Sequence, residues 1–170
     1  MSIKIVCDSV ADVPSQLVER YDIHVVPIII TMGNSTERES DISREEFWAA
    51  AAQGALPMTS QPPIGVFVET FSELVSAGHE VFCLTMTSKH SGTYNTACLA
   101  AREFGDRVRV VDSRELSYAI SLQVELAAQL AEKGCDLYHI EEAVLELQSR
   151  IFVRLGLEHF EWVRRGGRLA

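Results

Sequence analysis

Positive charge is scarce in this sequence, in which 24 Asp and Glu residues outnumber 15 Lys and Arg residues and give a formal net charge of −9 at pH 7. Proteins bind the phosphates of nucleic acids through clustered Lys and Arg side chains, so this balance argues against a nucleic-acid-binding surface. A local basic patch is still present near the C-terminus, where Arg164, Arg165 and Arg168 lie close together.

The sequence also lacks the cysteine patterns of metal sites and disulfide frameworks. Its four cysteines, Cys7, Cys83, Cys98 and Cys135, form no CxxC pair and have no zinc-type spacing. Cys7 and Cys83 lie inside apolar runs, where a free cysteine packs as a small hydrophobic residue. We therefore predict no metal site and no disulfide.

Long apolar runs are missing as well. No stretch is long enough to cross a bilayer, and Met1 leads directly into a short strand-like run that ends at Asp8, which does not resemble a signal peptide. These two absences predict a cytoplasmic location. The balance of 47% hydrophobic and 23% charged residues is that of a globular domain.

Apolar runs alternate along the chain with stretches of helical periodicity. The expected strands span residues 3–7, 23–31, 81–86 and 108–111. The expected helices open near Pro14 with Asp12 as N-cap, and otherwise cover residues 43–53, 64–76, 93–104, 115–133 and 137–153. Residues 32–42 and 54–63 are expected to be loops. This alternation predicts an α/β fold, with a mostly parallel β-sheet covered by helices on both faces.

Polar loops follow three of the expected strands. They are Asp8-Ser9, residues 87–93, and Asp112-Ser113-Arg114. The carboxyl ends of parallel strands share one edge of the sheet, and ligands commonly bind there. Thr59-Ser60-Gln61 precedes a helix, so we expect this segment to face the same edge.

The loop at residues 87–93 is rich in hydroxyl groups, contains Gly92 and opens a helix, which makes it a candidate anion site. Gly92 would let the backbone approach a ligand closely. Helix capping alone explains Thr93, whereas ligand contact is the better interpretation of Ser91. For His90, ligand contact and solvent exposure are equally good interpretations. For Thr59 and Ser60, ligand contact and helix capping are equally good interpretations.

Catalytic motifs are absent around these loops. Ser91 has no GxSxG context, and the sequence contains neither a P-loop nor a GxGxxG fingerprint after a strand. Asp8 and Asp112 are interpreted as hydrogen-bond anchors for neighbouring loops rather than as catalytic acids. The residues thus predict no catalytic group and favour the binding of a small anion.

The same motifs resemble those of the DegV family, the bacterial fatty-acid-binding proteins. The matching segments, in family order over nearly the whole chain, are Asp8-Ser9, Thr59-Ser60-Gln61-Pro62, residues 88–94, Asp112-Ser113-Arg114 and Arg165-Gly166-Gly167-Arg168. The resemblance implies a two-domain α/β protein, with residues 1–155 as the first domain and residues 156–170 as the start of the second.

The resemblance also implies a function. One long-chain fatty acid would lie between the domains, with its carboxylate held by hydroxyls at the positions of Thr59 or Ser60 and of Ser91, next to His90 and Gly92. Some members present the fatty acid to a separate kinase for phospholipid synthesis and act as carriers without chemistry or a cofactor of their own. Members often carry glycines where this chain has residues 117–121, and they usually continue into a second domain.

Two other functions remain open at this point. One is a hydrolase or phosphotransferase that uses Ser91 or Asp8. The other is an interaction module that has lost lipid binding and self-associates, as a homodimer for example, through apolar surface near Phe160 and Trp162.

Overall fold

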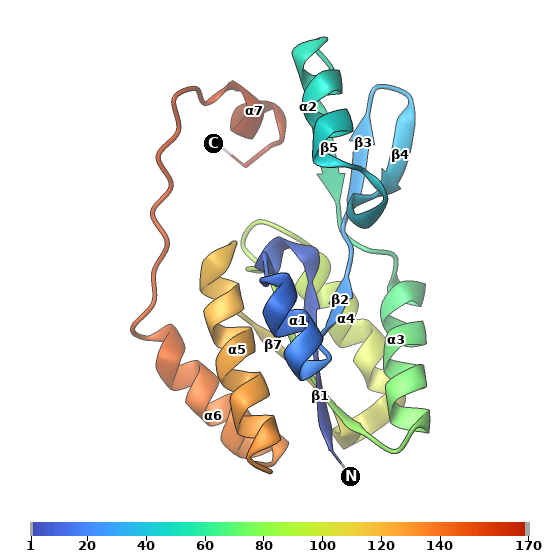
Figure 1. Ribbon diagram of the computed structural model, residues 1–170, viewed down its shortest axis with the longest axis vertical. Coiled ribbons are helices and arrows are strands. Elements are labelled where there is room, and N and C mark those ends of the chain that lie inside the picture. The colour runs from blue at the N-terminus through green and yellow to red at the C-terminus, as the bar shows by residue number, and fades with distance from the viewer. Residues whose placement is uncertain (1, 169–170) are drawn as a thin grey trace.

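The main sheet of the computed structural model, which describes residues 2–168, has four strands in the order β2-β1-β6-β7 (Figure 1). The strands are β1 (Ile3–Asp8), β2 (His24–Val26), β6 (Glu80–Thr85) and β7 (Val108–Asp112). All three neighbouring pairs are parallel. The predicted α/β fold with a parallel sheet is therefore confirmed.

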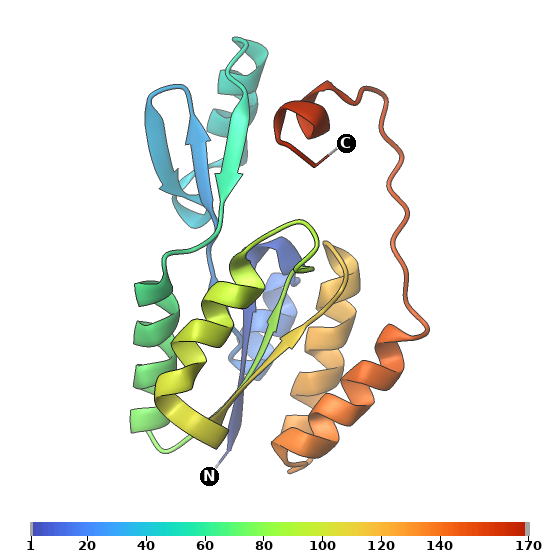
Figure 2. The ribbon, with the colours of Figure 1, turned by 180° about the vertical axis from the view of Figure 1, so that it is seen from behind.

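Helices cover both faces of this sheet. They are α1 (Ser15–Tyr21), α3 (Ile64–Ser76), α4 (Thr93–Ala101), α5 (Tyr118–Glu132) and α6 (Leu137–Gln148). Helices α1, α5 and α6 pack on one face of the sheet, and α3 and α4 pack on the other (Figures 1 and 2).

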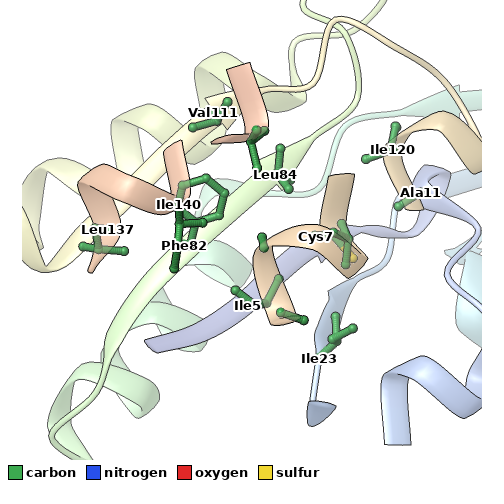
Figure 3. Packing of buried hydrophobic residues seen from close by; sticks show 14 residues of the cluster. Ile5, Cys7, Ala11, Ile23, Phe82, Leu84, Val111, Ile120, Leu137 and Ile140 are labelled. Atoms are coloured by element: carbon green, nitrogen blue, oxygen red, sulfur yellow. The ribbon is translucent and has the colours of Figure 1, made fainter. Parts of the chain in front are cut away.

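Side chains of the central strands alternate between two separate cores, as the period of two in a β-strand requires. Ile5 and Cys7 of β1 pack with α5 and α6, in the cluster drawn in Figure 3, whereas Val6 between them packs with α3 and α4. Phe67 and Phe71 of α3 are fully buried in the second core. Burying a side chain of this size stabilises the fold by about 1.5–3 kcal/mol, and these two phenylalanines therefore serve the core.

A second, antiparallel sheet has the strand order β4-β3-β5. Its strands are β3 (Ile29–Met32), β4 (Ser35–Arg38) and β5 (Pro57–Ser60), and the helix α2 (Arg44–Ala52) lies beside them in Figure 1. The prediction of loops at residues 32–42 and 54–63 was therefore wrong. Every residue of β4 is exposed, so this strand carries no apolar alternation from which it could be predicted.

The expected single strand at residues 23–31 is in fact two strands that belong to different sheets. β2 ends at Val26 and β3 begins at Ile29, with Pro27 between them. Proline has no amide hydrogen for a β-ladder, so the ladder stops there. Pro27 and Ile28 form the connection through which the chain passes from the parallel sheet to the antiparallel one.

The first helix starts later than expected. Asp12 does not cap it, but adopts the left-handed conformation after a short 3₁₀ helix, η1 (Ser9–Ala11), and Pro14 directly precedes α1. The capping box predicted for α2 is confirmed: Ser43 Oγ accepts a hydrogen bond from the Glu46 amide, and the Glu46 carboxylate accepts one from the Ser43 amide.

Other helix boundaries also differ from the predictions. The helix expected over residues 93–104 ends at Ala101 and continues as a 3₁₀ helix, η3 (Arg102–Arg107), in which Gly105 has a non-helical conformation. The last predicted helix ends at Gln148 rather than residue 153, and α5 begins at Tyr118. The remaining 3₁₀ helix of the described chain, η2 (Glu39–Asp41), precedes α2.

Beyond α6 the chain runs extended along the molecule to a short helix, α7 (Glu161–Arg165), which lies near α2 (Figures 1 and 2). Trp162 of α7 stacks on Trp48 of α2, with ring centroids 6.5 Å apart. The described part of the chain has no helix that is both long and apolar enough to cross a membrane.

Candidate functional site

A pocket of about 450 Å³ lies at the carboxyl edge of the parallel sheet. Its lining combines apolar side chains with a few polar ones: Val10, Ile28, Thr59, Ser60, Met86, His90, Ser91, Leu116, Leu155, Val163 and Arg168. Val10 follows β1 and Met86 follows β6, and these two strands are neighbours in the sheet. From β1 the chain continues to β2 at one edge of the sheet, and from β6 it continues to β7 at the other edge. The pocket therefore lies at the topological switch point, where ligands of open α/β sheets bind.

Ser91 lies at this pocket, just before α4. Its Oγ accepts a hydrogen bond from the Thr93 amide at 3.2 Å and lies 2.8 Å from Thr93 Oγ1. A hydroxyl has two lone pairs and one proton. When the Thr93 hydroxyl is the donor, both lone pairs of Ser91 are occupied, and its proton is left to bind an acceptor in the pocket.

Thr59 and Ser60 line the same pocket from the antiparallel sheet. They are the last two residues of β5, where they pair with Ile30 and Ile29 of β3. The pairing holds their backbone in place while both residues stay exposed. Hydroxyl groups predicted from two distant parts of the sequence thus converge on one pocket, although Thr59 and Ser60 lie in a strand and not in the expected loop.

His90 and Gly92 occupy different places. His90 lines the pocket, and its backbone carbonyl accepts a hydrogen bond from Arg168 Nε at 3.4 Å. Gly92 is not a lining residue. A Cβ atom added to it would lie 1.8 Å from Oε1 of Gln61, whose Nε2 donates a 2.7 Å hydrogen bond to Thr96. Gly92 therefore makes room for Gln61, which joins the segment after β5 to α4.

Arg168 supplies a cation at the pocket that the sequence reasoning did not assign to the site. The sequence did contain a signal, because Arg168 belongs to the C-terminal basic patch of an otherwise acidic chain. Leu155 and Val163 reach the same pocket from the C-terminal segment. Periodicity could not place Leu155 there, since residues 149–160 are in neither a helix nor a strand, and Val163 lies in α7, a helix of only five residues.

Asp8 is a hydrogen-bond anchor, as its position after the first strand suggested. The side chain is fully buried, with Oδ2 accepting from the Met86 amide at 2.7 Å and Oδ1 from the Val10 amide at 3.0 Å. Burial raises the pKa of the Asp8 carboxyl to about 6, against the lowering effect of these two amides, and the charge of Glu39 raises it further.

Ser9 and Asp112 hold neighbouring parts of the same edge. Ser9 Oγ accepts a 3.1 Å hydrogen bond from the amide of Ile28, another lining residue, and donates to Glu39. Asp112 accepts hydrogen bonds from the amides of Ser88 and Arg114. Both aspartates predicted to anchor loops therefore do so.

Neither Ser91 nor Asp8 has the partners of an activated nucleophile. In the described chain, the hydrogen bonds of Ser91 Oγ go to Thr93, a residue that cannot act as a general base. The two oxygens of Asp8 are both occupied by backbone amides. Residues 2–168 also contain no group of three or more His, Cys, Asp and Glu residues that could hold a metal ion.

Comparison with known proteins identifies the family. A family model described as "Uncharacterised protein, DegV family" matches residues 2–170. The chain belongs to the DegV family. A DegV domain-containing protein from Caldanaerobacter subterraneus subsp. tengcongensis is 36% identical over 171 residues, which cover 99% of this chain and 61% of that relative. One from Clostridium perfringens is 33% identical over 174 residues, with the same coverage of 99% and 61%.

Solved DegV structures share the fold. A fatty-acid-binding DegV family protein from Thermus thermophilus superimposes with a TM-score of 0.91 at 34% identity, over 99% of this chain and 61% of that one. DegV from Bacillus subtilis, described as a fatty acid binding protein, gives a TM-score of 0.80 at 29% identity, over 88% of this chain and 54% of that one. The chain thus spans about three fifths of the length of its DegV relatives.

Proposed function

We propose that this chain binds a long-chain fatty acid in the pocket at the sheet edge. The hydroxyl of Thr59 or Ser60 and the hydroxyl of Ser91 would hold the carboxylate, with Arg168 as the nearby cation. The observation that carries the proposal is the convergence of these hydroxyl groups, from two distant segments, on a pocket whose other walls are largely apolar.

The chemistry of the lining suits both ends of such a ligand. A carboxylate that leaves water needs several hydrogen-bond donors, and charge-assisted donors such as arginine are the strongest. The acyl chain needs apolar surface, because each buried CH₂ contributes about 0.8 kcal/mol. Val10, Ile28, Met86, Leu116 and Val163 offer that surface. The volume of about 450 Å³ lies in the usual range of small-molecule sites.

The relatives support the same ligand class. The Thermus thermophilus and Bacillus subtilis proteins are described as fatty-acid-binding, and their folds superimpose on this chain with TM-scores of 0.91 and 0.80. Ser91 has Thr93 rather than a base as its partner, which supports a carrier over a hydrolase or phosphotransferase.

We further propose that the whole protein is a carrier that presents its fatty acid to a fatty-acid kinase. The resemblance to carriers of the DegV family supports this role, and a binding assay with purified kinase would test it. We also propose that residues 1–155 form the first domain and that residues 156–170 begin a second one. In support, α6 ends at Gln148 and the chain then runs extended before α7.

Fatty-acid binding is tested by titrating the protein with oleate and by mass spectrometry of lipid extracted from it. We expect oleate to bind, and Ser91→Ala to weaken binding about tenfold, because one donor to a charged acceptor is lost. Ser88→Ala is the matched control, since Ser88 lies in the same loop but does not line the pocket.

Two results would contradict the proposal. The first is no binding of oleate together with no extracted lipid. The second is equal oleate affinity of Ser91→Ala, Ser88→Ala and the unchanged protein, which would place the carboxylate away from Ser91.

A further inference from the structure

Two walls of the pocket depend on one buried acid. The amides of Val10 and Met86 both donate to Asp8, and both residues line the pocket. Val10 lies in η1 after β1, and Met86 follows β6, so the Asp8 side chain ties the loops on either side of the topological switch point to each other. These contacts fix the backbone from which two apolar wall side chains project.

The two hydrogen bonds depend on the charge state of Asp8. An ionised carboxylate accepts hydrogen bonds at both oxygens, whereas a protonated one has a hydroxyl at one of them. A proton on Asp8 would therefore replace one acceptor with a donor that faces a backbone amide. The loop that loses its acceptor is freed, and its wall of the pocket is no longer fixed.

Asp8 is placed to take up that proton near neutral pH. Its side chain is fully buried, and burial raises its pKa to about 6. Within residues 2–168, the charged group that acts on Asp8 is the acidic Glu39 beside η1. Burial raises the pKa of the neighbouring Cys7 and Cys83 thiols, which keeps them neutral. Helix α5 contributes apolar side chains such as Ile120 to the cluster that contains Cys7.

We propose that Asp8 is a proton-controlled positioning residue of the pocket, whose ionised form holds the Val10 and Met86 walls for the ligand and whose protonation releases the ligand. This inference rests on the proposed fatty-acid function. Because linkage is reciprocal, a bound fatty acid lowers the proton affinity of Asp8 by the same factor by which protonation weakens binding. Acidification therefore favours unloading of the carrier.

The first test is the affinity for oleate between pH 7.5 and pH 5.0, measured for the unchanged protein and for Asp8→Asn. Between pH 7.5 and pH 5.0, we expect the oleate affinity of the unchanged protein to fall about tenfold more than that of Asp8→Asn. The reason is that protonation of Asp8 removes a hydrogen bond to a charged group. Asp8→Asn should bind about tenfold more weakly at pH 7.5. Titration of the oleate carboxyl is common to both proteins and cancels in the ratio of their affinities.

Two further variants separate Asp8 from other groups. Asp12→Asn is the matched control, because Asp12 is exposed, does not line the pocket and has a left-handed conformation that asparagine tolerates. It should keep the pH profile of the unchanged protein. His90 is the histidine that lines the pocket, so it is tested separately. His90→Gln should keep the loss of oleate affinity between pH 7.5 and pH 5.0 that Asp8→Asn removes.

A second readout needs no ligand. In hydrogen exchange, corrected for the intrinsic effect of pH, the amides of Val10 and Met86 should both be protected at pH 7.5, and one of them should be less protected at pH 5.0. In Asp8→Asn, which keeps one side-chain acceptor, one of the two amides should be unprotected at both pH values. Identical pH profiles of Asp8→Asn and the unchanged protein, or full protection of both amides in Asp8→Asn, would overturn the inference. If oleate does not bind at all, the proposed function fails, and the exchange measurement alone decides whether Asp8 positions the walls.

Discussion

Single residues at this sheet edge have roles that depend on burial and backbone conformation more than on chemical type. Asp8 and Asp112 both follow strands, yet Asp8 is fully buried and Asp112 is only half-buried. A folded-state pKa of about 6 lies above the ordinary value of 3.8, so the stability that Asp8 contributes is present below pH 3.8 and is lost as pH rises through 6. Its ionised form thus weakens the fold while it holds the pocket walls.

Ser117 offers a prediction about backbone strain. It precedes α5 with φ 53° and ψ −137°, a conformation that side chains disfavour, and its Oγ donates a 2.6 Å hydrogen bond to Asp12. Ser117→Ala loses that hydrogen bond and keeps the strain, whereas Ser117→Gly loses the hydrogen bond and relieves the strain. We expect the glycine variant to be the more stable of the two by about 1 kcal/mol or more, measured by urea unfolding.

The helical position Ala127 supplies the control for Ser117. Ala127→Gly should be less stable than the unchanged protein, which has alanine there, because glycine in a helix interior costs about 1 kcal/mol relative to alanine. A Ser117→Ala variant that is at least as stable as Ser117→Gly would show that the backbone at this position is not strained.

Residue chemistry was the most predictable part of the site. The place of Thr59, Ser60 and Ser91 at one sheet edge and the anchoring role of Asp8 followed from their positions beside expected strands and helices, whereas ligand contact by the three hydroxyls stays a prediction. The contribution of Arg168 did not, because it depends on how the chain returns to the pocket after α6. The reason why position 92 needs a glycine could not be predicted either, because the side chain of Gln61 occupies the space that a Cβ atom of residue 92 would need.

At the scale of elements, the parallel sheet was predictable and the antiparallel sheet was not. Strands β1, β6 and β7 are apolar runs, and a buried parallel strand has that pattern. By contrast, β4 is polar and exposed throughout, and β5 is short and begins with proline. Their pairing with β3 comes from tertiary contact, although Gly33-Asn34 between β3 and β4 is a dipeptide typical of two-residue hairpins.

Helix α2 carries the element-scale prediction. It has no buried residue, so its stability depends strongly on local interactions such as the capping box of Ser43 and Glu46. We expect Ser43→Ala to cost about 1 kcal/mol of local helix stability, which raises amide exchange in α2 about fivefold. Ser43→Asp is the matched variant, because aspartate also caps helices. Unchanged exchange in Ser43→Ala would mean that contacts outside the helix hold its first turn.

At the scale of the whole molecule, the contact between α2 and α7 links the C-terminal segment to the antiparallel sheet region. The sequence has two tryptophans, and Trp48 and Trp162 are stacked on each other. Trp162→Ala should therefore increase the quenching of Trp48 fluorescence by acrylamide. Phe152→Ala is the control, because Phe152 is highly exposed and precedes α7. Equal quenching in the two variants would show that α7 does not stay against α2 in solution.

Exposed apolar side chains are also concentrated in this C-terminal segment. Phe152, Leu155, Phe160 and Trp162 are between 45% and 70% exposed. Apolar surface of this kind favours association, so the possible homodimer stays a prediction that light scattering can test.

The pocket walls come from the parallel sheet, the antiparallel sheet and the C-terminal segment together. A molecule that fills the pocket would touch all three parts and would bind the folded chain but not the unfolded one. By mass action, a ligand at a hundred times its dissociation constant adds about 2.7 kcal/mol to the free energy of unfolding. The supply of ligand in the cell would then govern how long each copy survives proteolysis, so that empty copies are removed first.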